Sequence, residues 1–269
     1  MVTYDFKDGQ GPVPAHRHKN PDGSEGGWVA DTATVVATAH VGPESQVFQN
    51  ALICNEARIF DYAQVYGATL ICDNCHVSGM AKVVDSRISG KVLISDEAEL
   101  LNATICNLVQ IRDKAVIVDA MIREHAIVRG QARISDNALV YDRAHIFGNA
   151  RVSESAQVFG QAEVCGQARV GGNARVDGTS KVSGTSELVV GYYTDLNVAA
   201  SPTVIIPASG PVIVGVDDRI IIGEQCKTLV EWDSDPPCNW EQWRSSLVAL
   251  LPKSPQTEGT HYLDQVLDQ

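Results

Sequence analysis

Aliphatic residues recur every six positions along about three fifths of this chain. The pattern is clearest from Ala150 to Ser186, where a valine stands in each hexad and an alanine or serine follows it four residues later. A period of six suits neither a helix nor an ordinary pair of strands. It is typical of a solenoid, in which short strands stack coil upon coil. The chain is therefore expected to be a repeat protein built along one axis.

The register can be followed without a gap from Val29 to Leu188, through twenty-eight aliphatic rungs. Three steps are five residues long instead of six: Val83–Ile88, Leu100–Ile105 and Ile117–Ile122. If three rungs make one coil, all three short steps fall at the same corner of consecutive coils, whereas random loss of residues would scatter them. The spacing therefore predicts about nine triangular coils, which at about 4.8 Å per coil make a prism about 45 Å long.

The residue types within each hexad resemble those of the hexapeptide-repeat proteins, which have an aliphatic residue at position one and a small residue at position five. The resemblance implies an all-β fold, a single-stranded left-handed parallel β-helix. In it the aliphatic residue points inward and the small residue fits the tight corner. Arg87, Val92 and Met121 stand where a small residue is expected and depart from the pattern.

Two segments of different composition flank the predicted β-helix, which spans residues 28–190. Residues 1–27 are rich in Gly, Pro, His and charged residues and predict an extended N-terminal arm. The arm leads into Trp28, a large side chain suited to covering the first coil. Residues 191–269 form the expected C-terminal extension, a small α/β tail.

Within this tail, VIVGVDDRIIIG at 212–223 predicts two short strands with a turn at the two aspartates. The segment WEQWRSSLVALL at 240–251 has apolar residues at helical spacing behind the N-cap residue Asn239, and 262–267 predicts a second short helix. Together with GGWV at 26–29, the tail is similar to the bacterial YdcK-like branch of the hexapeptide-repeat proteins.

Composition narrows the classes of partner. The net charge of −12 and the sequence pI near 4.9 argue against a nucleic-acid surface, which needs clustered Lys and Arg. The sequence shows neither an export signal nor a membrane-length apolar run, so we expect a cytoplasmic protein that does not insert into membranes. In that compartment the seven cysteines are expected to be reduced thiols.

We number the three sides of the prism by their first rungs: Val29 on face one, Val35 on face two and Val41 on face three. Residues beside each rung point outward. Face three carries a polar set: His40, Arg58, His76, Arg112, Arg129 and His145. Face two and its border with face one carry an apolar set, which is the predicted contact surface: Leu52, Cys54, Tyr66, Leu70, Cys72, Leu101, Met121, Leu139, Tyr141 and Phe159.

An apolar column that faces solvent usually marks a partner surface. The alternative is that the C-terminal helices fold back over it. Hexapeptide-repeat proteins commonly form trimers, so the resemblance favours a homo-oligomer, with a trimer as the expected assembly. We therefore expect a non-catalytic binding or scaffold protein that requires no cofactor.

The competing hypothesis is an acyltransferase that uses acyl-CoA at a subunit interface. The hexapeptide acyltransferases resemble this chain in the repeat, but they hold a catalytic histidine near a projecting loop, and no long loop interrupts the register here. His125 is the candidate catalytic base, with Glu124 beside it, although neighbours on a strand point apart.

Several Cys and His patterns suggest metal or haem chemistry, and for each a structural role is favoured. Residues 72–76 read CDNCH, the spacing of covalent haem attachment, but Cys75 fills an inward corner while Cys72 faces outward. Cys54 and Cys72 should stack one coil apart, close enough for a disulfide, yet two thiols are expected. Zinc beside His76 is disfavoured because a flat sheet directs ligands poorly for a tetrahedral site.

Two further histidine patterns resemble parts of metal sites. His40 and His76 lie two coils apart in one column, and the γ-class carbonic anhydrases of this superfamily bind zinc through histidines of neighbouring subunits. The third histidine of that pattern is replaced here by Ala81, so this enzyme is disfavoured. His16 and His18 in the arm alternate around Arg17 and are expected to be a solvated charge cluster. No metal site is predicted.

Overall fold

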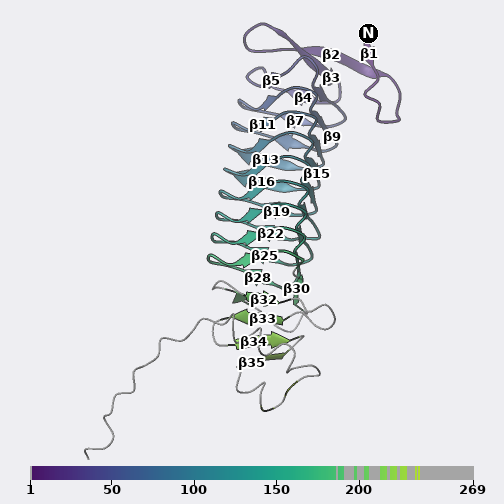
Figure 1. Cartoon of the computed structure of the whole chain (residues 1–269). Helices are drawn as coiled ribbons and strands as arrows, with labels where there is room; N and C mark the ends of the chain where they lie inside the picture. The colour runs from purple at the N-terminus through teal and green to yellow at the C-terminus, as the bar shows by residue number, and fades with distance from the viewer. Residues whose placement is uncertain are drawn as a thin grey trace, which may run out of the picture.

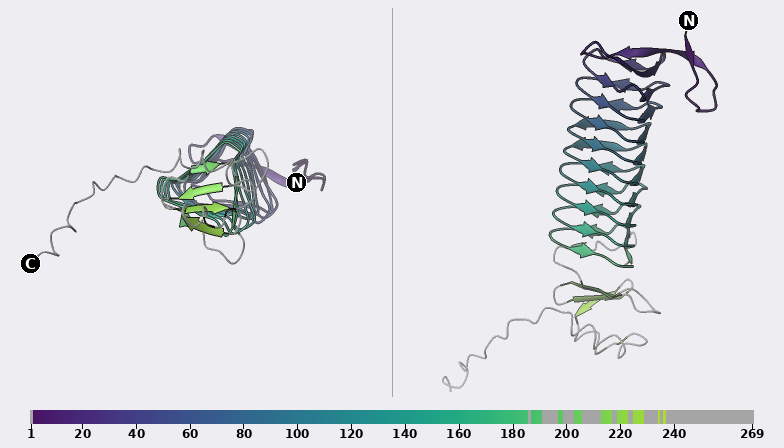
Figure 2. Two further views of the ribbon diagram at one scale, coloured as in Figure 1. Left: turned by 60° about the horizontal axis from the view of Figure 1, so that its bottom comes forward. Right: turned by 45° about the horizontal axis from the view of Figure 1, so that its top comes forward.

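The protein is a column of stacked triangular coils with antiparallel strands at both ends (Figure 1). The computed structural model describes residues 2–185, 187–190, 197–198, 203–205, 213–216, 219–222 and 225–228, with 234 and 236. Two further views show that the coils superimpose along one axis (Figure 2). The predicted parallel β-helix of about nine three-sided coils is confirmed.

Each face of the prism is one sheet of short strands, and within the coils neighbouring strands are parallel. Face one holds β1 (Thr3–Tyr4), β2 (Val13–Lys19), β3 (Glu25–Ala30), β6 (Gln46–Val47), β9 (Gln64–Tyr66), β12 (Lys82–Val84), β15 (Glu99–Leu101), β18 (Val116–Val118), β21 (Arg133–Ile134), β24 (Arg151–Val152), β27 (Arg169–Gly172) and β30 (Glu187–Val190). Face two holds β4 (Thr34–Val35), β7 (Leu52–Ile53), β10 (Leu70–Ile71), β13 (Arg87–Gly90), β16 (Thr104–Asn107), β19 (Met121–Ile122), β22 (Leu139–Val140), β25 (Gln157–Val158), β28 (Arg175–Val176) and β31 (Asn197–Val198). Face three holds β5 (His40–Val41), β8 (Arg58–Ile59), β11 (His76–Val77), β14 (Leu93–Ile94), β17 (Gln110–Ile111), β20 (Ile127–Val128), β23 (His145–Ile146), β26 (Glu163–Val164) and β29 (Lys181–Val182).

The core is a continuous apolar stack along the axis of the column. Every predicted rung from Val41 to Leu188 is at most 3% exposed, and Val35 in the first coil is partly buried against the same core. Because each coil sits directly on the next, one coil's rungs pack against those above and below it. The hydrophobic effect therefore drives stacking, and the hydrogen bonds between coils set its register.

The three five-residue steps lie at the corner between faces one and two, as the spacing predicted. The small residue there comes three positions after the rung instead of four: Ser86, Ala103 and Ala120 are at most 6% exposed. This corrects the assignment of Arg87 and Met121 to the small slot, because both are outward strand residues. Val92 does occupy its corner slot and is 1% exposed.

Left-handed backbone at the corners explains where many of the acidic residues lie. Asp61, Asp73 and Asp113 all have φ between 55° and 61°. Asp and Asn tolerate this conformation better than other side chains with a Cβ. A carboxylate oxygen of each accepts a hydrogen bond from a glycine N–H of the next coil, at 2.9, 2.9 and 2.8 Å. Acidic side chains thus link successive corners, and the flat faces are left with few of them.

The N-terminal arm closes the first coil. Strand β2 pairs antiparallel with β3, and a bulge between Arg17 and Lys19 turns His18 inward, where it is 7% exposed. His18 Nε2 hydrogen-bonds Ala39 O at 3.2 Å. The Asn20 amide pairs with both backbone groups of Val41, at 3.2 and 2.9 Å, as a neighbouring strand would. The open edge of face three is therefore satisfied by side chains.

The expectation that 16–18 form a solvated charge cluster is wrong for His18, which is buried; His16 and Arg17 are exposed, and both have partners that hold the arm in place. His16 Nδ1 lies 2.9 Å from Asp31 Oδ1. The Arg17 guanidinium donates to Gly26 O and Pro43 O and stacks 4.7 Å from the Trp28 ring. Trp28 lies within β3 beside the arm, where it also stacks on Tyr4.

At the other end, β31 adds a parallel strand to face two beyond residue 190. A separate antiparallel sheet follows, with β32 (Thr203–Ile205), β33 (Ile213–Val216), β34 (Arg219–Ile222) and β35 (Gln225–Thr228). Strands β33 and β34 are the two predicted at 212–223. The helices predicted at 240–251 and 262–267 lie outside the described residues.

Candidate functional site

The predicted contact residues all lie outward on the column, because strand geometry alternates side chains between the core and solvent. None of the ten is fully buried. Leu52 and Met121 on face two are 37% and 41% exposed, and Leu101 on face one is 44% exposed. Leu70 and Leu139 are half-buried by their neighbours in the column. On face two the apolar side chains thus form two patches, Leu52 with Leu70 and Met121 with Leu139, which Arg87 and Thr104 separate along the axis.

The corner between faces one and two brings two apolar columns close together. Tyr66, Val84, Leu101 and Val118 stand in register on face one and line a shallow groove of about 400 Å³. Each of the three five-residue steps removes one residue from this corner. Fewer residues therefore separate the groove from the outward residues of face two. Polar groups at the corner already have partners: Asp119 Oδ1, for example, accepts a hydrogen bond from Asn102 Nδ2 at 2.6 Å.

A stack of four planar groups occupies the lower part of face two. The Tyr141 and Phe159 rings are parallel, with centroids 4.8 Å apart. The Arg123 guanidinium lies 4.9 Å from the Tyr141 ring, and that of Arg175 lies 5.3 Å from the Phe159 ring. Stacking of guanidinium on aromatic rings keeps the charge while covering apolar surface. Met, Tyr, Phe and Arg are the residues enriched at the centres of protein interfaces.

The N-terminal arm covers the start of the apolar column on face one. Phe6 stacks on Phe48 with centroids 4.7 Å apart, and Phe48 stacks on Tyr66 at 4.6 Å. Phe6 and Phe48 are each 3% exposed. The alternative that C-terminal helices cover the column falls on residues outside the described ones. Among those described, the arm covers only the first coils, and Leu101 stays exposed.

Cys54 and Cys72 form a disulfide in the upper part of face two. The expectation of two thiols at these positions is therefore wrong. Adjacent parallel strands hold the two residues in register on the same face, with their Cα atoms 4.7 Å apart, within the range that a disulfide spans. Cys75, Cys106 and Cys165 are free thiols. Cys238 lies outside the described residues.

The haem-like spacing at 72–76 is a consequence of the repeat. Cys72 is bonded to Cys54, and Cys75 is fully buried at a corner, where burial raises the pKa of its thiol to about 11. His40 and His76 share a column with Arg58 between them, and both rings lie near Phe60. Among the described residues, no three His, Cys, Asp or Glu side chains cluster with the spacing of a metal site.

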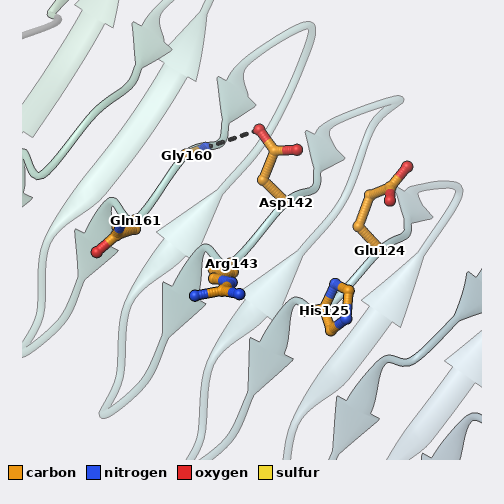
Figure 3. Close-up of a pocket in the computed structure, with 6 residues that line it drawn as sticks. All are labelled: Glu124, His125, Asp142, Arg143, Gly160 and Gln161. Atoms are coloured by element: carbon orange, nitrogen blue, oxygen red, sulfur yellow. Dashed lines mark hydrogen bonds between the residues drawn. The ribbon is translucent and has the colours of Figure 1, made fainter.

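The candidate base His125 lies at the corner between faces two and three, in a shallow depression of about 270 Å³ (Figure 3). Its side chain is exposed and points away from that of Glu124, whereas Arg143 follows it one coil later on the same side. The nearby Asp142 carboxylate accepts a hydrogen bond from Gly160 N at 3.1 Å. Within the described part of the chain, no carboxylate bonds to His125, so no acid–base pair is formed there.

Sequence reasoning missed one arrangement on face three. Arg129 Nε donates to His145 Nε2 at 3.0 Å, and Arg112 Nη2 donates to Gln110 Oε1 at 2.8 Å. The register predicted that these residues share a face, and it placed Arg112 and Arg129 in adjacent coils. The choice of neutral partners depends on side-chain rotamers, which a column position alone does not specify.

Comparison with known proteins supports the β-solenoid repeat and assigns no activity to the chain. No helix among the described residues combines the length and apolar character needed to cross a membrane. No curated protein matched the chain. Residues 144–160 match the family described as the YdcK beta solenoid repeat. This match over one segment and the three-sided parallel solenoid both fit a hexapeptide-repeat, YdcK-like β-helix.

Proposed function

We propose that the protein is a non-catalytic, oligomeric binding or scaffold module that associates with copies of itself through face two and its border with face one. The observation that carries this proposal is the exposed apolar surface formed by Leu52, Leu101 and Met121 with their half-buried neighbours Leu70 and Leu139. Exposed apolar patches of this kind are costly to leave in water and usually mark a contact.

A second copy of the chain is the occupant that the geometry favours. The surface is a flat array of side chains with one repeat distance, so another copy presents a matching array. Apolar residues lie on both sides of one corner, with Tyr66 and Leu101 on face one and Leu70 and Leu139 on face two. Two adjacent but different patches suit a heterologous contact that closes into a ring. The hexapeptide-repeat resemblance favours a trimeric ring.

Acyl transfer is the second candidate, and the depression around His125 is the observation that favours it. The exposed imidazole lacks an orienting carboxylate among the described residues, so a neighbouring subunit would have to complete the site. Thermal stabilisation by acetyl-CoA that disappears in His125→Ala would support this candidate and contradict the non-catalytic assignment.

The self-association is tested by the double variant Leu70→Asp with Leu139→Asp, measured by light scattering. Two carboxylates in the middle of the proposed contact would have to be desolvated there, so we expect a fall from the oligomer mass to the monomer mass. The matched control is Leu93→Asp with Ile127→Asp, which changes two half-buried aliphatic residues on face three. Circular dichroism checks that both variants fold.

The control should keep the mass of the unaltered protein. A folded face-two variant with unchanged mass would rule out this surface as the contact, and so would a monomeric unaltered protein.

A further inference from the structure

We propose that Arg112 and Arg129 on face three form a binding site for a tetrahedral dianion, the phosphate group of a small phosphate monoester. This site lies on a different face from the proposed self-association surface and does not depend on it. Three features support it: neutral partners that orient both guanidinium groups, their register in adjacent coils, and donors that have no acceptor.

Arg112 is held by an amide and keeps donors unused. Its Nη2 donates to Gln110 Oε1 at 2.8 Å on the same strand. Its Nε is buried and has no hydrogen-bond partner in the described part of the protein. The Nε is enclosed and out of reach of a ligand, whereas Nη1 has no hydrogen-bond partner among the described residues and is the donor that a ligand would meet.

Arg129 is held by an imidazole and an aromatic ring. Its Nε donates to His145 Nε2 at 3.0 Å, and its guanidinium carbon lies 5.1 Å from the centroid of Phe147. His145 must be neutral to accept this bond. The pKa of His145 is lowered, chiefly by burial; the charge of Arg129 lowers it further, that of Glu163 raises it, and that of Arg112 lowers it. The Nη groups of Arg129 have no partner among the residues that the structure describes.

The two arginines stand side by side on neighbouring strands. Strands β17 and β20 pair in parallel with Ile111 opposite Val128, so Arg112 lies opposite Arg129. The Arg112 N–H donates to Val128 O at 3.0 Å, which fixes that register. Neighbouring strands lie about 4.8 Å apart, and like charges carried by adjacent strands repel each other. An anion between them would convert the repulsion into attraction.

Nearby carboxylates are engaged elsewhere. Glu163 follows His145 in the column, and its carboxylate lies 3.0 Å from Lys181 Nζ. Asp113 accepts a hydrogen bond from Gly130 N at 2.8 Å. In a protein with 33 acidic residues, the described hydrogen-bond and stacking partners of both arginines are neutral. The charge of +2 is thus available to a ligand.

A phosphate monoester fits this arrangement better than a single carboxylate does. It carries a charge near −2 and three terminal oxygens, so it can accept from both guanidinium groups at once. Arginine's planar fork suits such recognition, and its orientation by Gln110, His145 and Phe147 lowers the entropy lost on binding.

The test is isothermal titration of the full-length protein with inorganic phosphate and with glycerol 3-phosphate at constant ionic strength. We expect both to bind, and Arg112→Gln or Arg129→Gln to weaken binding about tenfold or more, since each removes charged hydrogen bonds. Equal affinities would assign the site to the phosphate group alone, whereas tighter binding of the ester would assign it to the esterified ligand. Either result supports the proposal.

Arg133→Gln and Arg151→Gln are matched controls. These arginines are also exposed and in register on neighbouring strands, but they lie on face one. Both substitutions should leave the affinity for phosphate within about twofold of that of the unaltered protein, because salt screens exposed charges that lie far from the site. If Arg112→Gln does not fold, Arg112→Lys keeps the charge and loses the fork, and should still weaken binding. Absence of binding at millimolar phosphate, or an equal loss in the face-one controls, would overturn the proposal.

The site is also separable from self-association. The variant carrying Leu70→Asp and Leu139→Asp should bind phosphate as the unaltered protein does, whether or not it is monomeric. Loss of phosphate binding in that variant would contradict a site contained within one face of one subunit.

Discussion

Faces two and three share one backbone and one core but present different chemistry to solvent. Strands of both faces are short, parallel and stacked at the same repeat, and the inward residues Ile88 and Ile94 are equally buried. Both faces carry arginines, but face two adds Leu52, Met121 and a disulfide, whereas face three adds the histidines His40, His76 and His145. The difference lies almost entirely in the outward columns.

The comparison shows how a solenoid separates folding from function. A rung must be aliphatic and its corner residue small whichever face it belongs to, because each packs against identical neighbours one coil away. Outward positions have no such requirement and can vary without disturbing the stack. Function in this chain is therefore to be sought in columns that run along the axis, where residues about 18 apart in sequence become neighbours.

The largest expected effect tests whether the two faces share their core. Ile88→Ala under face two and Ile94→Ala under face three should each lower the free energy of unfolding by about 2–5 kcal/mol, because each leaves a cavity between coils. The two losses should agree to within about 1 kcal/mol, measured by urea denaturation. A large loss of unfolding free energy for one variant and a small loss for the other would contradict the claim that rungs of the two faces contribute equally to the core.

A smaller effect should distinguish the outsides through pH. The pKa of His145 is lowered, chiefly by burial, so the unfolded chain binds a proton more readily than the folded protein. Stability from this group is present above its unfolded pKa near 6.5 and is lost as the pH falls below it. The pKa values of His76 and His18 are also lowered, mainly by burial, whereas the outward columns of face two from Thr34 to Asp177 contain no histidine.

Unfolding measured from pH 7 to pH 5 should therefore show decreasing stability. His145→Gln should flatten this dependence in part, because glutamine can accept from Arg129 but does not titrate. An unchanged slope in that variant would show that His145 does not contribute to it, and would remove pH response as a distinction between the faces.

The period of six was sufficient to predict the stack of rungs, because each side chain's direction follows from its place in the hexad. The short steps at Val83, Leu100 and Ile117 were located at one corner for the same reason. The small residue within those corners was misassigned, since removing one residue moves the tight position from Arg87 and Met121 to Ser86 and Ala120.

Other features depend on contacts that no periodicity encodes. The packing of Phe6 on Phe48 and the role of Asn20 at the edge of β5 join an irregular arm to the repeat over 20 or more residues. The register places Cys54 and Cys72 close enough for a disulfide, and the expectation of two thiols fails because it rests on cellular compartment and not on this geometry. The hydrogen-bond partners of Arg112 and Arg129 depend on side-chain rotamers, which the repeat does not specify.

The central claim, that face two is the self-association surface, is tested most directly by the two free cysteines that lie one on each face. Cys106 is half-buried on face two, and Cys165 on face three is buried at 7% exposure, so its labelling should be slow at every concentration. Alkylation of each, followed by peptide mapping at increasing protein concentration, should show slower labelling of Cys106 and a constant rate at Cys165. A Cys106 rate that does not change with concentration, in a protein that light scattering shows to associate, would contradict the account.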